Sequence, residues 1–159
     1  MTDTQTTDQT PFPLVAAELR RTIDGALPML REISGAQAEQ APAPGKWSPQ
    51  QVIGHLIDSA SNNHQRFVRA QEGSTLVFPG YAQEHWVRCQ HYEDGAWDHL
   101  TTLWHAYNHH VAHVIEHIPE SYRSVQCLVG TYPPATLGFL AHDYVVHLRH
   151  HLGQIHALP

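Results

Sequence analysis

Histidine is the residue type that dominates the chemistry this sequence could perform. The chain has 159 residues, and fifteen of them are histidines spread along its length. Histidine is the commonest protein ligand of divalent metals and the usual base near neutral pH. Because three or four ligands saturate a metal ion, most of the fifteen are expected at the surface. The elements that carry them must show which ones could gather around an ion.

Four long segments with helical periodicity carry most of these histidines. Ser48 followed by Pro49 is a typical helix start, Pro119 stops another helix, and Thr136 is a candidate cap for the last one. No window shows the alternation of a half-buried strand. The sequence predicts an all-α fold, a four-helix bundle with a short extra helix and long loops. The expected long helices cover 12–33, 49–70, 97–118 and 137–156, the short one covers 84–91, and loops fill 35–47, 71–82 and 119–135.

The third long helix carries the most regular set of histidines, one every four residues. His105, His109, His113 and His117 lie roughly opposite the apolar stripe of this helix. That position is the solvent face of an amphipathic helix. We therefore interpret this histidine ladder as a surface feature, although histidines four residues apart can chelate a metal weakly.

The last helix carries a second pair, His147 and His151, which border its apolar stripe. Residues four apart project on one side of a helix, and a helix can present two ligands to one zinc-like ion in this way. A pair of hydrogen-bonded histidines at the core boundary is the alternative, and helical phase leaves both open. Leu148 stands where the HExxH motif of zinc proteases has its glutamate, so that motif is absent here.

His55, on the second long helix, is the third candidate ligand. It lies far from the apolar stripe of its helix, on a face shared with Asp58, Ser59, Asn62 and Arg66. Helical phase favours a solvent face, and the alternative is the polar lining of a cavity between helices. Periodicity alone assigns no metal site to these residues; Asn62 and Arg66 could contact an anionic substrate, although neither is assigned that role.

Two segments carry a resemblance to a known family. KWSPQQVIGHLIDSASNNHQRF and, near the end, HDYVVHLRHHLGQI resemble the DinB/YfiT-like family of metal-binding four-helix bundles, the damage-inducible DinB superfamily. The resemblance implies that His55, His147 and His151 hold one divalent ion per chain, with zinc or nickel as the leading choices. For His55 it outweighs the argument from helical phase.

Two further residues are candidates for supporting the metal ligands. Asp58 follows His55 by one turn and could orient an imidazole through its carboxylate, although a solvated surface position is the alternative. Gln154 could line the same end of the last helix, where an exposed glutamine is the alternative reading. The residues that would act directly in catalysis stay unassigned.

The resemblance leaves several functions open. A three-histidine site keeps positions free for water or substrate, whereas structural zinc sites are usually closed by four ligands. Such an ion could activate water or a thiol. We expect a metal-dependent thiol S-transferase of the bacillithiol or mycothiol type acting on a small molecule. A metal-dependent hydrolase and a non-catalytic metal-binding stress-response protein are the alternatives, and a homodimer is compatible with such a bundle.

Composition limits the classes of protein further. The chain is 42% hydrophobic and 15% charged, which is a globular balance. Residues 1–10 are expected to be a disordered tail before one domain over 11–159. A net charge of -6 without a cluster of basic residues argues against nucleic-acid binding.

The location expected from the sequence is the cytoplasm. The chain begins without the apolar core of a signal peptide, and no apolar stretch approaches the roughly 20 residues that span a bilayer. Cys89 and Cys127 are too few for a disulfide framework and are interpreted as reduced thiols.

Overall fold

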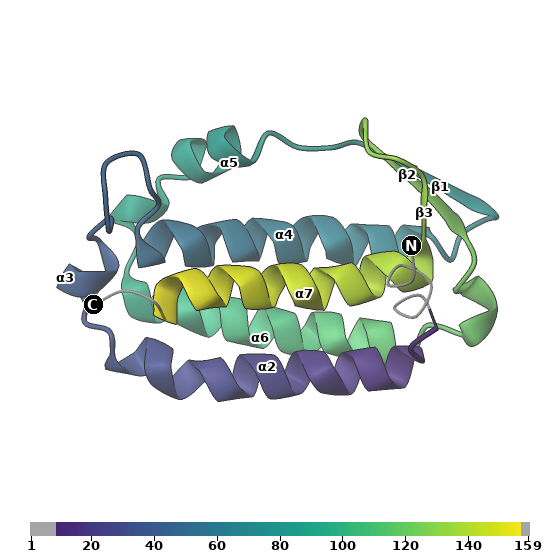
Figure 1. Cartoon of the computed structure of the whole chain (residues 1–159), viewed down its shortest axis with the longest axis horizontal. Helices are drawn as coiled ribbons and strands as arrows, with labels where there is room; N and C mark the ends of the chain where they lie inside the picture. Colours follow the sequence, from purple (N-terminus) through teal and green to yellow (C-terminus); the bar gives the residue numbers. More distant parts are fainter. Residues whose placement is uncertain (1–8, 157–159) are drawn as a thin grey trace, which may run out of the picture.

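The protein folds as a bundle of four long helices in a computed structural model that describes residues 9–156. The tail predicted over 1–10 lies almost entirely outside the described residues. The bundle consists of α2 (Phe12–Glu32), α4 (Pro49–Arg69), α6 (Trp97–Glu116) and α7 (Leu137–His156), and Figure 1 shows them side by side. The prediction of a four-helix bundle is confirmed.

The starts of α4 and α7 could be predicted from the sequence, because each is stabilised by a cap within the first helical turn. Ser48 caps α4: its side chain accepts a hydrogen bond from the Gln51 backbone, and the Gln51 side chain accepts one from the Ser48 backbone at 3.0 Å. Thr136 Oγ1 accepts a hydrogen bond from the Phe139 backbone at 3.1 Å. The loop predicted over 35–47 was wrong at its start, because Ser34 caps the short helix α3 (Gly35–Ala38).

The structure also contains a small sheet, which the sequence did not predict. Strand β2 (Gln126–Val129) pairs in parallel with β1 (Thr75–Phe78) and antiparallel with β3 (Ala135–Thr136). The loops predicted over 71–82 and 119–135 were therefore wrong in part. Strands of two to four residues are too short to show alternation, and β1 and β2 pair across a long stretch of chain.

A segment that we call the covering segment packs against α4 and contacts part of its polar face. The segment comprises α5 (Gln83–Cys89) and the single turn η1 (Tyr92–Asp94), and both contact α4. Figure 1 shows α5 running beside α4, outside the bundle. The Gln50 side chain ties α4 to η1 by donating to the backbone carbonyls of Tyr92 at 2.7 Å and Glu93 at 3.2 Å. One polar face of α4 thus lies under protein.

The four long helices pack around an apolar core. Trp104 of α6, Phe67 of α4 and Leu148 of α7 are fully buried in it. None of the helices described is long and apolar enough to span a bilayer.

Candidate metal centre

Three histidines from two helices meet in the bundle. His55 of α4, His147 of α7 and His151 of α7 each offer one ligand atom, and these three atoms lie within 4.8 Å of one another. The Nε2 atoms of His55 and His147 are 3.3 Å apart. The ring centroid of His151 lies 4.6 Å from that of His55. The structure therefore brings together the three histidines that the sequence singled out, referred to below as the triad.

The burial of His55 corrects the argument from helical phase. Its side chain is 0% exposed, so the solvent face favoured by phase was wrong. Asp58, Ser59 and Asn62 on the same face are buried as well. The His55 ring lies against the rings of Trp47, His147 and His151, with centroids 5.0, 5.2 and 4.6 Å away, whereas the covering segment hydrogen-bonds to Asp58. Periodicity within α4 cannot reveal these contacts. The alternative interpretation, a polar surface inside the protein, is the one that the structure supports.

The distance between two of the triad nitrogens fits a shared metal ion, and the ligand atom of His151 lies within 4.8 Å of both. Two nitrogens bound at about 2.0–2.1 Å to a tetrahedral ion are about 3.3–3.4 Å from each other. The observed 3.3 Å between the Nε2 atoms of His55 and His147 agrees with that value. The same distance is long for a direct hydrogen bond between two rings. The donor set consists of imidazole alone, which suits zinc, nickel, copper or iron.

The triad histidines are held in the neutral form that binds metals. Burial lowers the pKa of His55 to about 3 and that of His147 to about 4, with a further contribution from the neighbouring imidazoles. Burial also lowers the pKa of His151. The Nδ1 atoms of His55 and His147 are buried and have no hydrogen-bond partner within residues 9–156. A buried polar atom without a partner costs about 1–3 kcal/mol, so these two atoms lower the free energy of unfolding of the protein.

Gln154 lies where it can orient one triad histidine. Its side-chain oxygen is 2.9 Å from Nδ1 of His151. This contact favours the tautomer with a proton on Nδ1, which leaves Nε2 free to bind an ion. The Gln154 amide nitrogen also contacts His150 at 3.2 Å.

Asp58 is engaged with the covering segment. Its Oδ1 accepts hydrogen bonds of 2.7 Å from both the Tyr92 hydroxyl and the Gln90 amide. Burial raises the pKa of Asp58, whereas these hydrogen bonds oppose the rise. Among the described residues no hydrogen bond joins its carboxylate to a triad ring, so the role of Asp58 in orienting an imidazole stays a prediction.

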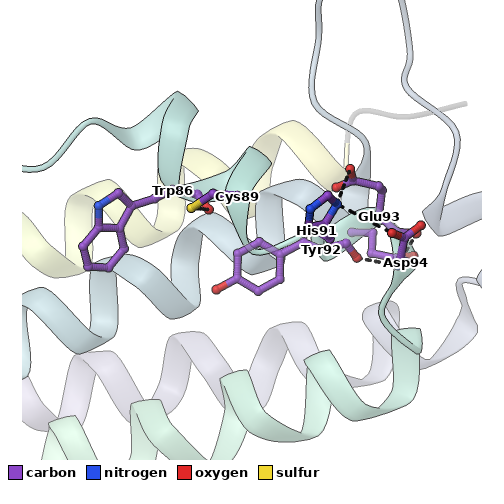
Figure 2. A network of polar contacts seen from close by, with 7 residues as sticks. Trp86, Cys89, His91, Tyr92, Glu93 and Asp94 are labelled. Carbon is purple, nitrogen blue, oxygen red and sulfur yellow. Dashed lines mark hydrogen bonds and ion pairs between the residues drawn. The ribbon is translucent and has the colours of Figure 1, made fainter.

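Tyr92 closes the covering segment onto α4 through a strained turn. His91 has a left-handed backbone with φ of 50°, and Figure 2 shows it beside the carboxylates of Glu93 and Asp94, 3.8 and 3.7 Å from its Nδ1. The Tyr92 ring packs against Gly54, where a Cβ atom would lie 2.2 Å from the ring. Only glycine leaves room for this contact, directly before the first triad histidine in the chain.

The histidine ladder of α6 is at the surface, as its phase predicted. Asp24 of α2 lies between two of its members, with Oδ1 at 2.9 Å from Nε2 of His105 and 2.8 Å from Nε2 of His109. These two histidine side chains are 26% and 37% exposed. His113 and His117 are exposed further along the helix. Within the described residues the ladder thus contributes to two further clusters at the surface, one of Asp24, His105 and His109 and one of His113, Glu116 and His117.

Comparison with known proteins places the chain in a family. A family model described as the DinB superfamily matches residues 18–155, which is most of the chain. The chain belongs to the DinB superfamily. A search of curated proteins found no match.

A solved structure shares the fold of this DinB-superfamily chain. The chain is similar to YfiT from Bacillus subtilis, with a TM-score of 0.80, 20% sequence identity, and coverage of 92% of this chain and 85% of that one. YfiT is described as a probable metal-dependent hydrolase with an unusual four-helix bundle topology. At this identity, the likeness establishes the shared fold.

Two cavities border the triad. The first has a volume of about 600 Å³, lies between α4, α7 and the loops beside the sheet, and includes His147 in its wall. The second, of about 590 Å³, includes His151 together with Trp47, Glu84 and Gln154. Each cavity therefore contains a different triad histidine in its lining.

Sequence reasoning missed the polar side chains that line the first cavity. Asp143 lies four residues before His147, and that spacing places the two on one side of α7. Burial raises the pKa of Asp143 and raises that of Tyr81 to about 12. Arg66, which the sequence placed on the same face as His55 and offered as a contact for an anionic substrate, also lines this cavity. For Asp143, the spacing to His147 was the signal available from the sequence.

Proposed function

We propose that this chain is a metal-dependent enzyme in which His55, His147 and His151 hold one divalent ion, zinc or nickel. The observation that carries the proposal is the pair of facing Nε2 atoms 3.3 Å apart, with a third histidine beside them. Three neutral protein ligands favour an open site, because structural zinc sites usually have four. An ion bound there would lower the pKa of a thiol or water and so supply a nucleophile near neutral pH.

We propose further that the reaction is the transfer of a small thiol to an electrophilic acceptor. Two cavities, each with one triad histidine in its lining, give room for two substrates. In the transfer, the sulfur loses its proton, a bond forms between sulfur and an acceptor carbon, and the leaving group departs with its electron pair. We assign the uptake of the proton to Asp143, because it lines the first cavity together with His147 and precedes it by one turn of α7.

Hydrolysis is the second candidate. It is supported by the description of YfiT as a probable metal-dependent hydrolase and by the same open triad. Hydrolysis needs only one organic substrate, so the second cavity would then play no part in the reaction. Asp143 would in that case take a proton from the attacking water.

The proposed transfer is tested with zinc- or nickel-loaded protein, bacillithiol, mycothiol or cysteine as thiol, and monochlorobimane as acceptor. We expect thiol-dependent formation of the fluorescent adduct in wild type, loss of that activity in His147→Ala, and its retention in His109→Ala. The thiol of the adduct is identified by mass spectrometry. Adduct formation that is equal in wild type and His147→Ala would rule out a role of the triad in the transfer.

The alternatives give different results in the same assay. Hydrolysis of ester or amide substrates that depends on His147, without adduct formation, would favour the hydrolase. A stoichiometric ion with neither activity would favour a metal-binding protein without turnover. A homodimer and a cytoplasmic location stay part of the proposal, and analytical ultracentrifugation and cell fractionation test them.

A further inference from the structure

Among the described residues, Arg66 is a half-buried cation without a carboxylate partner. It lies on α4 and lines the first cavity. Its Nη1 donates to Asn63 Oδ1 at 3.2 Å, its Cζ lies 5.4 Å from the centre of the Phe78 ring, and its Nε is buried with no hydrogen-bond partner in residues 9–156. Within residues 9–156, no acidic side chain comes within ion-pairing distance of it. Burial without a counter-charge lowers the pKa of this guanidinium.

Such an arrangement costs free energy in the absence of an anion. Removing a cation from water is unfavourable unless a charge or several hydrogen-bond acceptors compensate it. The Asn63 amide oxygen supplies one acceptor, whereas a guanidinium has five N–H donors. An anionic group that enters the cavity would satisfy the remaining donors, and a carboxylate matches the fork geometry of arginine.

The position of Arg66 defines the length of a ligand that could reach it. It follows His55 by eleven residues on the same helix, which at about 1.5 Å per residue is about 16 Å along the axis. The cavity also reaches His147, so it connects the two. Phe139, Leu140 and Val129 supply apolar walls. A ligand that fills it would have an apolar body and a polar group at each end.

Asp143 is the carboxylate that shares this cavity, and it limits where an anion can bind. It precedes His147 by four residues on α7, about 6 Å along the helix axis. It therefore lies nearer the triad than Arg66 does. A second anion is disfavoured beside Asp143 and favoured at Arg66, which gives the ligand one orientation.

We propose that the first cavity binds substrates with an apolar body and a terminal carboxylate, and that Arg66 binds the carboxylate while the reacting group lies at the triad. The proposal rests on the proposed function, because the triad end defines the reacting group. It makes Arg66 a residue that determines substrate specificity. The chain has nine basic and fifteen acidic residues, so general attraction of anions would not produce such a preference.

The test compares a carboxylate with a neutral ligand of the same shape. Isothermal titration calorimetry measures binding of 6-phenylhexanoate and 6-phenylhexanamide to wild type, Arg66→Met and Arg69→Met. Arg69 is exposed on the same helix and lines neither cavity, so its variant is the matched control. The protein is first treated with a chelator, because a carboxylate could also bind a metal ion at the triad.

We expect wild type and Arg69→Met to bind the acid about tenfold or more tightly than the amide, as charge-assisted hydrogen bonds predict. Arg66→Met should bind both equally. Arg66→Lys keeps the charge without the fork geometry and should show an intermediate preference, which also covers the case in which Arg66→Met does not fold. Equal binding of both ligands by wild type, no binding of the acid, or an undiminished preference without Arg66 would overturn the proposal.

Failure of this proposal and failure of the proposed function can be told apart. If the triad holds no ion but chelator-treated protein prefers the acid through Arg66, the cavity assignment stands and the metal enzyme does not. If the triad holds an ion and the enzyme transfers thiols, but Arg66 has no effect on ligand preference, the proposed function stands and the role of Arg66 is wrong. His147→Ala, titrated with the same pair of ligands, should keep the preference because it leaves Arg66 in place.

Discussion

The triad and the histidine ladder are built from the same side chain, yet their surroundings differ. His55 is fully buried, and its Nδ1 has no hydrogen-bond partner among residues 9–156. The ladder histidines His105 and His109 are partly exposed and share the carboxylate of Asp24. Both clusters bring three candidate ligand atoms within 4.8 Å of one another. Proximity alone therefore does not separate a metal centre from a surface cluster.

Burial and hydrogen bonding do separate them. His105 and His109 already contact the carboxylate of Asp24, and His113 and His117 are exposed to solvent, so their polar atoms need no further ligand. In the triad, burial removes three imidazoles from water, which costs free energy, and it lowers their pKa values so that they stay neutral. A divalent ion would bind their lone pairs and offset that cost. The comparison assigns the tight site to the triad and, at most, weak chelation to the ladder.

Removing single histidines should have the largest effect of the changes that test this comparison. We expect His55→Ala, His147→Ala and His151→Ala each to abolish the binding of about one ion per chain, because three ligands are the minimum of an open site. His109→Ala and His113→Ala should keep it. Elemental analysis of tag-free protein after gentle chelator washing measures the occupancy. Full occupancy in the three triad variants, or its loss in the ladder variants, would reverse the assignment.

Gly54→Ala tests whether the covering segment maintains the buried surroundings of the triad. The added Cβ would lie 2.2 Å from the Tyr92 ring, so the ring or the helix must move, at a cost of about 1–3 kcal/mol. We expect a lower free energy of unfolding in urea, together with weaker metal binding. Gly153→Ala, with nothing within 4 Å of its added Cβ, is the matched control on α7. A variant as stable as wild type would show that the segment yields without strain.

The part of this arrangement that sequence could predict is local. The cap at Ser48 and the helical phase of His147 and His151 depend on residues within one or two turns, so the bundle and two of the three histidines could be placed. His55 could not be placed by phase, because the rings packed against it come from outside α4, namely Trp47, His147 and His151. Only the resemblance to a family identified it.

Long-range contacts account for the other differences. Strand β1 pairs with β2 across 47 intervening residues, from Phe78 to Gln126, and neither strand has a periodic pattern of its own. The isolation of Arg66 could not be predicted either, since the absence of a counter-charge is a property of the assembled cavity. Spacing within one helix placed Arg66 on the face of His55 and suggested contact with an anionic substrate, but it could not show that Arg66 would be half-buried in a cavity that reaches His147.

Gln154→Ala sharpens the comparison because, in the part of the chain that the structure describes, Gln154 makes the one hydrogen bond between a triad ring and a side chain other than histidine. The contact of 2.9 Å to His151 Nδ1 fixes the ring, and loss of such a partner weakens metal binding about tenfold or more. Competition with a chromophoric chelator measures the affinity. Gln65→Ala, exposed on α4, is the control and should be neutral. An unchanged affinity in Gln154→Ala would mean that packing alone orients His151.

Asp24→Asn probes the ladder and should have the smallest effect. Hydrogen bonds from His109 and His105 lower the pKa of Asp24 below its ordinary 3.8. A carboxyl whose pKa is lower in the folded than in the unfolded protein stabilises the fold above the unfolded pKa, and this contribution is lost as the pH falls through the folded pKa. Because the pair is exposed, the loss on mutation should be only about 0.2–1 kcal/mol at pH 6.

Urea unfolding at pH 6 and at pH 3 measures this difference. The deficit of Asp24→Asn relative to wild type should shrink at the lower pH, while metal occupancy at pH 6 stays that of wild type. The same experiment separates the two clusters, because a carboxylate that held the resident ion would be needed for occupancy. If Asp24→Asn lost the ion, the partly exposed cluster would be a genuine metal site, and burial would no longer be the property that distinguishes the triad.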